Sequence, residues 1–217
     1  MESRMKHFLL ITFLVSLAAA PAAWAQSWEV GFGAGGSFIT SQTISNPIGN
    51  VDAGRSPAIA ASAWLDNNSS GMIGGELRYD YEHGDLKLNS GGSSYSFGSM
   101  SNAIHYDLVL NLSSKEASVR PFVAAGAGVK IYSGTGAEQP YQPFGNVAAL
   151  SDVRDVKPLV SVGGGLKFKI SPAATFRVEV HDFLTPFPNK LVLPVNGSKV
   201  GGWLSDFVVM AGLGFAF

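Results

Sequence analysis

Residues 119–132 read VRPFVAAGAGVKIY, and this stretch decides the fold. Apolar residues alternate along it with polar or small ones, which is the pattern of a β-strand with two different faces. One face carries Val119, Val123, Ala125, Val129 and Ile131, and the other carries Arg120, Gly126, Gly128 and Lys130. Strands of soluble proteins usually have about 5–6 residues, whereas a tilted strand needs about 9–11 residues to cross a membrane. The stretch therefore indicates a membrane-spanning strand.

Seven further segments also have the character of strands. They are Trp28–Phe38, Pro57–Leu65, Met72–Glu82, Ala103–Leu112, Leu159–Ile170, a segment that begins at Phe176, and Asp206–Phe217. Six of them alternate in the same way. The pattern of Pro57–Leu65, which is rich in Ala, leaves open the face on which Trp64 lies.

The connections between these segments alternate in length. Short polar turns are predicted at Asp66–Ser70, Ser113–Ser118 and Ser171–Ala174, and long loops at Thr40–Ser56, His83–Ser94, Ser133–Val156 and Leu184–Trp203. This alternation is typical of outer-membrane barrels, which have short turns in the periplasm and long loops outside. The sequence thus predicts an all-β fold, an eight-stranded antiparallel up-and-down transmembrane β-barrel.

The distribution of charge between the two strand faces favours a membrane barrel over a soluble sandwich. The polar faces carry the acids Glu29, Glu76, Asp80, Glu82, Asp107, Glu179 and Asp206, and the bases Arg78, Arg120, Lys130, Lys167, Lys169 and Arg177. The apolar faces carry only Asp182. An Arg or Lys that faces lipid at mid-depth costs about 2–4 kcal/mol, so a lipid-facing wall should be almost free of charge. A soluble sandwich would put the charged face in water, but here much of that face is Gly, Ala and Ser, as in a crowded interior.

The composition excludes several other classes of protein. The 217 residues include 15 Lys and Arg, 16 Asp and Glu, and no Cys, with 46% hydrophobic and 14% charged residues. A typical soluble domain has about 25% charged residues. The near-neutral charge argues against a nucleic-acid partner, and the absence of Cys excludes disulfide scaffolds and thiolate sites.

The first 25 residues have the layout of a secretory signal peptide. Arg4 and Lys6 precede the apolar run from Phe8 to Ala20, and Ala23-Trp24-Ala25 forms a cleavage pattern that leaves Gln26 as the mature start. The alternative, an uncleaved membrane anchor, has an apolar run that is short for a span of about 20 residues. We therefore expect a signal peptide over residues 1–25, a barrel domain over residues 26–217, and export to the cell outer membrane.

Three short motifs resemble the small eight-stranded outer-membrane β-barrel proteins of Gram-negative bacteria, of the OmpA, OmpX and OmpW type. Residues 119–128 resemble an R-P-Y-V-x-x-G-x-G strand, and Phe176–Asp182 resembles an R-x-E-x-R-D strand with His181 in place of the commoner Arg. The C-terminus resembles the signal read by the barrel-assembly machinery, through Phe207, Val209, Leu213, Phe215 and Phe217. The resemblance covers the chain after residue 25, and it implies a superfamily without a specific function. The partners that it implies are outer-membrane lipid, the assembly machinery and periplasmic chaperones, for a monomeric protein.

An eight-stranded barrel has a lumen that side chains can fill, so we expect a luminal charge network. Its candidate members are Glu29, Glu76, Arg78, Asp80, His105, Asp107, Arg120, Lys167, Lys169, Arg177 and Glu179. Antiparallel pairing should bring Arg78 close to His105 and Asp107. Because an unpaired buried charge is expensive, we expect ion pairs that plug the lumen, in a protein with a structural or surface-interaction role. The alternative is a narrow channel for small solutes or hydrophobic ligands through the same barrel.

Two further hypotheses concern the ends of the strands and the long loops. Some barrels of this size are lipid-modifying enzymes, and His181, Asp182, Ser205 and Asp206 lie near the ends of adjacent predicted strands. There is no G-x-S-x-G motif, so we predict no catalytic residues, and neither a cofactor nor a metal site. The apolar loop residues of Thr185–Pro188, Leu191–Val195 and Pro140–Phe144 are expected to pack on each other or dip into the outer leaflet; the alternative is a contact surface for an extracellular partner.

Overall fold

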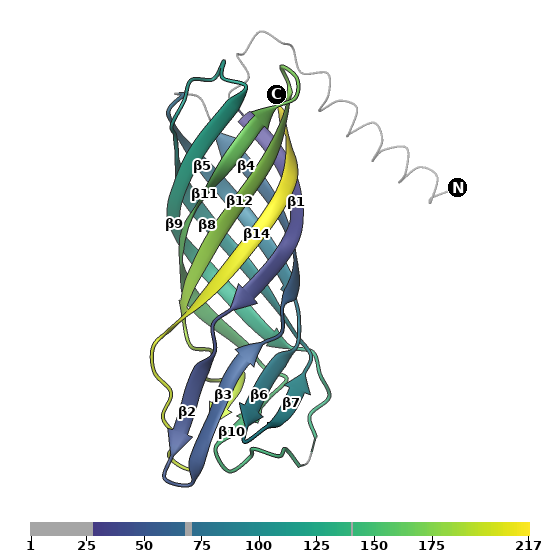
Figure 1. Cartoon of the computed structure of the whole chain (residues 1–217), viewed down its shortest axis with the longest axis vertical. Coiled ribbons are helices and arrows are strands. Elements are labelled where there is room, and N and C mark those ends of the chain that lie inside the picture. Colours follow the sequence, from purple (N-terminus) through teal and green to yellow (C-terminus); the bar gives the residue numbers. More distant parts are fainter. Residues whose placement is uncertain (1–27, 68–70, 140) are drawn as a thin grey trace, which may run out of the picture.

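The computed structural model describes residues 28–67, 71–139 and 141–217. Figure 1 shows a long barrel with a smaller β-rich cap at one end and the C-terminus at the other end. The predicted signal peptide and part of the predicted turn Asp66–Ser70 lie outside the described residues. No helix among the described residues is long and apolar enough to cross a membrane.

The barrel is closed by eight long strands, and each neighbouring pair is antiparallel. The strands are β1 (Trp28–Ile39), β4 (Ala58–Asn67), β5 (Ile73–His83), β8 (Ser99–Asn111), β9 (Val119–Gly134), β11 (Arg154–Lys169), β12 (Ala174–Pro186) and β14 (Trp203–Ala216). Their order around the barrel is β1-β14-β12-β11-β9-β8-β5-β4. The predicted fold class is confirmed. Each of the eight predicted segments overlaps one of these strands, with ends that differ by a few residues; β11, for example, begins at Arg154, before the predicted Leu159.

The alternation of the sequence places apolar side chains on the outer wall. Phe32, Ile59 and Leu108 are 61%, 72% and 63% exposed, whereas Asp66 and Asp107, on the strands of Ile59 and Leu108, are buried inside. Aromatic side chains gather near both ends of the wall. Trp28, Phe176 and Phe215 lie toward the turns, and Phe38, Trp203 and Phe207 lie toward the cap. An apolar band between two girdles of aromatic residues is typical of the outer surface of a membrane β-barrel.

The segments predicted as long loops are long connections, but they contain short β-strands, which the sequence pattern did not predict. They contain β2 (Gln42–Asn46), β3 (Gly49–Arg55), β6 (Leu86–Ser90) and β7 (Ser93–Phe97), which form a four-stranded sheet in the order β2-β3-β6-β7. β10 (Ala148–Leu150) pairs with β13 (Val192–Pro194). Together these six strands and their connections make the cap (Figure 1).

The cap is folded because its short strands bury a shared apolar core. This core consists of Ile44, Val51, Ala53, Leu86, Leu88, Phe97, Tyr132, Val147, Ala148, Leu150, Phe187, Leu191, Val192 and Leu204. The apolar residues of the predicted loops, such as Leu191 and Val192, thus pack on each other. Ile48 and Tyr141 are among the residues that do not, with 71% and 80% of their surface exposed.

Candidate functional site

The lumen is filled by a charge network, and its first cluster lies where the barrel meets the cap. Lys130 of β9 donates from Nζ to Glu82 Oε1 at 2.8 Å and to Asp206 Oδ2 at 2.6 Å. Arg55, the last residue of β3 in the cap, reaches the same two carboxylates, with Nη2 at 2.6 Å from Glu82 Oε2 and 2.9 Å from Asp206 Oδ2. Ser37 also contacts Arg55, Glu82 and Asp206. The cluster therefore joins the cap to the barrel through two cations and two carboxylates.

Arg55 remains charged in this cluster. Burial alone would lower the pKa of its guanidinium, but the nearby carboxylates of Asp206 and Glu82 outweigh it, so the pKa lies above the ordinary value. The side chain of Arg55 is only 2% exposed. Because a buried charge without a partner costs several kcal/mol, the two carboxylates hold β3 against the mouth of the barrel.

An apolar layer lies next to this first cluster, on the side away from the cap. Its members are Ala60, Ala103, Leu159, Phe183, Val208 and Met210, all buried inside the barrel. The ring of Phe183 lies 5.2 Å from Lys130 Nζ on one side and 5.1 Å from the His105 ring on the other. Water has no polar partner in such a layer, so the layer separates the first cluster from the charges below it.

The second cluster crosses the middle of the lumen between strands that are not neighbours. Arg177 of β12 pairs with Glu76 of β5, and Arg78 of β5 pairs with Glu179 of β12 at 2.5 Å. Arg78 also pairs with Glu76 at 3.3 Å, and Arg177 pairs with Glu179. The indole of Trp64 lies under both guanidinium groups, at 5.7 Å from Arg78 and 5.0 Å from Arg177. The inward position of Trp64, which the sequence left open, thus completes this cluster.

His105 extends the second cluster along β8. Its Nε2 lies 3.0 Å from Asp80 Oδ2 and its Nδ1 lies 2.9 Å from Asp107 Oδ1. Both nitrogens can donate to these carboxylates only in the doubly protonated ring. The predicted proximity of Arg78, His105 and Asp107 is present, because Arg78 pairs with His105, and Glu76 with Asp107, in the β5–β8 register.

Glycines on the inner wall make room for these large side chains. A Cβ atom at Gly31 or Gly212 would lie 2.1 Å or 2.6 Å from the ring of Trp64, and one at Gly163 would lie 2.6 Å from the ring of His181. The Gly-rich strands are therefore explained by packing in a narrow barrel.

The third cluster lies at the turn end of the lumen. Lys167 Nζ of β11 pairs across the barrel with Asp66 Oδ2 of β4 at 2.6 Å. The ring of Phe122 separates this pair from the centre, with Lys167 Nζ 5.3 Å from its centroid. Arg120 donates from Nε to the carbonyl of Ser113 at 3.1 Å, and Glu29 accepts a hydrogen bond from Trp64 at 3.3 Å.

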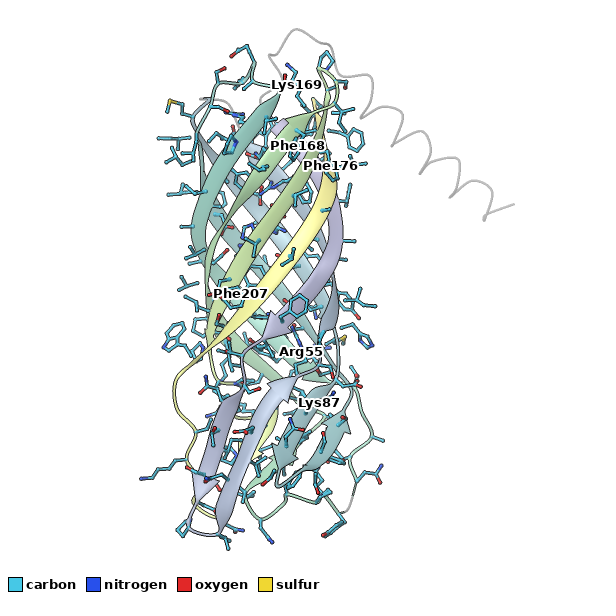
Figure 2. All side chains as sticks on the ribbon, viewed as in Figure 1. Arg55, Lys87, Phe168, Lys169, Phe176 and Phe207 are labelled. Carbon is cyan, nitrogen blue, oxygen red and sulfur yellow. The ribbon has the colours of Figure 1, made fainter. Side chains whose placement is uncertain are left out.

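Lys169 does not belong to the buried network, contrary to the sequence prediction. It is the last residue of β11 and its side chain is exposed, and Figure 2 shows it at the end of the barrel opposite the cap. The strand alternation assigned it correctly to the inner face, but the lumen opens to solvent at that level.

The candidate site set derived from the sequence lacked several residues of the network. Arg55 and Asp66 were assigned to a loop and a turn, and Trp64 to neither face. Lys130, Glu82 and Asp206 were recognised as inward-facing, but nothing in the sequence indicated that they meet. A charged residue close to the start of a predicted strand is the signal that could have marked Arg55, which lies two residues before Pro57.

The hypothesis of a lipid-modifying enzyme is not supported by the arrangement of its four residues. His181 is buried inside the lumen, where Ser161 Oγ lies 3.3 Å from its Nδ1. Ser205 donates instead to Asp182 at 2.7 Å, and Asp206 belongs to the first cluster. No group of three or more metal-ligating side chains occurs among residues 28–67, 71–139 and 141–217.

Four residues of the predicted assembly signal share one face of β14, and the fifth, Phe217, directly follows the strand. Each is between 44% and 50% exposed on the outer wall: Phe207, Val209, Leu213, Phe215 and Phe217. Their alternation continues the lipid-facing band to the end of the chain.

Comparisons with known proteins agree with this architecture. No family model and no curated protein sequence matches the chain. The Neisserial surface protein A structure matches with a TM-score of 0.58 and 11% identity, over 88% of this chain and 97% of the other. The outer membrane protein OprG from Pseudomonas aeruginosa matches with a TM-score of 0.59 and 10% identity, over the same shares. The chain has the fold of the small eight-stranded outer-membrane β-barrels.

A weaker similarity extends to the outer membrane protease OmpT from Escherichia coli. It has a TM-score of 0.47 and 9% identity, over 92% of this chain and 99% of the other. This similarity carries no information about the activity of this chain.

Proposed function

We propose that this outer-membrane barrel is a non-conducting, non-enzymatic anchor that presents its folded cap at the cell surface for interaction with a partner. The observation that carries the proposal is the filled lumen. Two apolar layers, around Phe183 and Phe122, alternate with three clusters of paired charges. A conducting path would need a continuous line of water through these layers.

The cap supports the surface role because it is a folded unit. Its core of buried apolar residues and its attachment through Arg55 keep it in one orientation over the barrel. In an outer-membrane barrel the long connections face outward, so the cap would lie outside the cell. Export by a cleaved signal peptide over residues 1–25, recognition by the assembly machinery and periplasmic chaperones, and a monomeric state belong to the same proposal.

A channel for hydrophobic ligands has less support. An apolar cavity lies between cap and barrel, lined by Ile39, Thr40, Ala53, Gly54, Arg55, Leu86, Ser99, Met100, Tyr132, Phe187, Pro188, Val192 and Leu204, with a volume of about 20 Å³. That volume is about the space of a single water molecule. A ligand would therefore have to displace the cap core.

Single-channel recording in planar lipid membranes tests the proposal. The wild-type protein should insert without steady conductance steps. Double replacement of Phe183 and Leu159 by Ala, which opens the apolar layer, should produce steps, and a Leu193→Ala variant on the exposed cap surface is the matched control. Steady wild-type steps that change when Glu76 or Arg78 is neutralised would instead establish the channel.

The surface role needs its own test, because a lumen that does not conduct is no evidence that the cap binds a partner. Deleting Pro186–Val195 would remove the core residues Phe187, Leu191 and Val192, so point substitutions are the sharper tool. Ile48→Ser and Tyr141→Ser change exposed side chains and should reduce adhesion of whole cells to a host or bacterial surface that the wild type binds. Equal adhesion of wild-type, variant and deletion strains would refute the surface role.

A further inference from the structure

The turn end of the lumen holds a cavity that the plug leaves open. Its volume is about 200 Å³, and it is lined by Glu29, Lys115, Glu116, Ala117, Arg120, Lys167, Lys169, Ser171, Pro172, Thr175 and Ala216. The lining residues on strands alternate with lipid-facing ones, so they point into the barrel. The cavity is therefore the end of the lumen, below the apolar layer of Val109, Phe122 and Ala124.

The charges around this cavity are predominantly positive. Four cations line it, namely Lys115, Arg120, Lys167 and Lys169, against the two carboxylates Glu29 and Glu116. Lys167 is neutralised by Asp66 at 2.6 Å. Arg120 interacts with Asp66, Glu29 and Glu116. Counted together, the four cations face these three carboxylates, so the cavity keeps an excess of one positive charge.

The donors differ in how they are held. Arg120 is 7% exposed and fixed to the carbonyl of Ser113, which makes it a rigid part of the floor. Lys115 lies on the Ser113–Ser118 turn and Lys169 at the end of β11, and both are exposed at the rim. The hydroxyl groups of Ser171 and Thr175 add neutral donors.

We propose that this cavity, which we name the turn-end vestibule, binds a small oxyanion of the phosphate class. The ammonium groups of Lys115 and Lys169 at the rim can form strong charge-assisted hydrogen bonds with phosphate oxygens. The vestibule is closed on its inner side by Phe122 and by the pair of Lys167 and Asp66. A site walled by protein screens charges less than open water does, so an anion gains more there than at isolated surface lysines. The proposal does not depend on the surface role of the cap.

The phosphate could be free in solution or belong to a lipid headgroup at the adjacent membrane surface. The strand residues of the vestibule point into the barrel, away from lipid, which favours the free ion. The two sources share one chemistry and are separated by the membrane environment in the experiment.

The site is tested by titration with sodium phosphate at constant ionic strength, using the full chain refolded in detergent micelles. The readout is the shift of backbone amide resonances of the Ser171–Ala174 turn. Lys115→Gln combined with Lys169→Gln should weaken binding about 4–25-fold, at about 2–5-fold for each partly exposed charge. Lys199→Gln, an exposed lysine on the cap, should leave the affinity unchanged.

A variant of opposite sign makes the proposal sharper. Glu116 is exposed on the rim, and Glu116→Gln removes a charge that repels the anion, so binding should tighten by about 2–5-fold. No saturable shift, equal weakening by Lys199→Gln, or weaker binding in Glu116→Gln would overturn the site.

The same titration in two kinds of nanodisc identifies the source of the phosphate. Equal affinity in nanodiscs of phosphatidylcholine and of phosphatidylglycerol would support a free ion. In phosphatidylglycerol the vestibule could already be saturated, while Lys115→Gln and Lys169→Gln still weaken binding. That result would keep the phosphate site and overturn its assignment to the free ion.

Discussion

Replacing Lys130 by Met should destabilise the barrel strongly, because it breaks the cluster that joins barrel and cap. The Lys130 side chain has no exposed surface and makes hydrogen bonds of 2.8 Å and 2.6 Å to two carboxylates. Each hydrogen bond to a charged group contributes about 1.5–3 kcal/mol, so two suggest about 3–6 kcal/mol. Removal of one partner from a buried ion pair costs about 3–5 kcal/mol by mutation. We therefore expect a loss of about 3–5 kcal/mol in the free energy of unfolding.

The assay is urea unfolding of the protein refolded into lipid vesicles, followed by tryptophan fluorescence. Lys199→Met is the matched control, since Lys199 is exposed and surface substitutions usually change stability by less than about 0.5 kcal/mol. Adding Glu82→Gln to Lys130→Met should recover part of the loss, because Arg55 then has a single carboxylate, Asp206, to neutralise. A Lys130→Met variant within about 1 kcal/mol of the control, or no recovery in the double variant, would refute the reasoning.

Three other changes probe separate parts of the molecule. Arg55→Ala should expose the cap to protease while the barrel stays protected, because the link between cap and barrel is lost; limited proteolysis with mass spectrometry reads this out, and an unchanged cleavage pattern would count against the link. Gly212→Leu should cost about 1–3 kcal/mol by overpacking, since even a Cβ there would lie 2.6 Å from the ring of Trp64; an unfolding curve equal to that of the wild type would contradict this. The pKa of Glu138 lies below its ordinary value because it accepts hydrogen bonds from the backbone N–H of Asp152 and from a nearby hydroxyl. The hydrogen bonds of the Glu138 carboxylate therefore add local stability above the unfolded pKa, and this stability is lost as pH falls through the folded pKa. Hydrogen-exchange protection of the Asp152 amide should drop as the pH is lowered from neutral into the acidic range. A Glu138→Gln variant, which has no carboxylate to titrate, should not show this drop.

The wall of the barrel was predictable from local pattern alone. In residues 119–132 the alternation fixes which side chains face lipid, because successive side chains of a strand point to opposite faces. Lipid tolerates almost no charge, so Arg120 and Lys130 had to face inward whatever the rest of the fold does. The neighbours Arg78 and His105 also followed, since antiparallel pairing across a connection sets their register.

The cap was less predictable because its strands are short and their apolar residues need partners from distant segments. Ile44, Leu88 and Leu191 lie in three different connections and are buried only together. Such segments resemble ordinary loops in sequence, since no single one holds enough apolar surface to fold alone. The error at Lys169 has a simpler cause: alternation gives the face of a strand but not the depth at which the lumen opens.

By itself the sequence determined the strands, their lipid-facing side and the inward side of most charges, because the membrane imposes one rule on every spanning residue. Only the tertiary structure decided which charges meet. Closure of the barrel brings Arg177 to Glu76 and Lys130 to Asp206, from strands that are not neighbours. The folding of the cap inserts Arg55, and the space left by Gly31 and Gly212 turns Trp64 inward. These pairings depend on distances across the lumen, which arise from the way all eight strands close and which no local pattern contains.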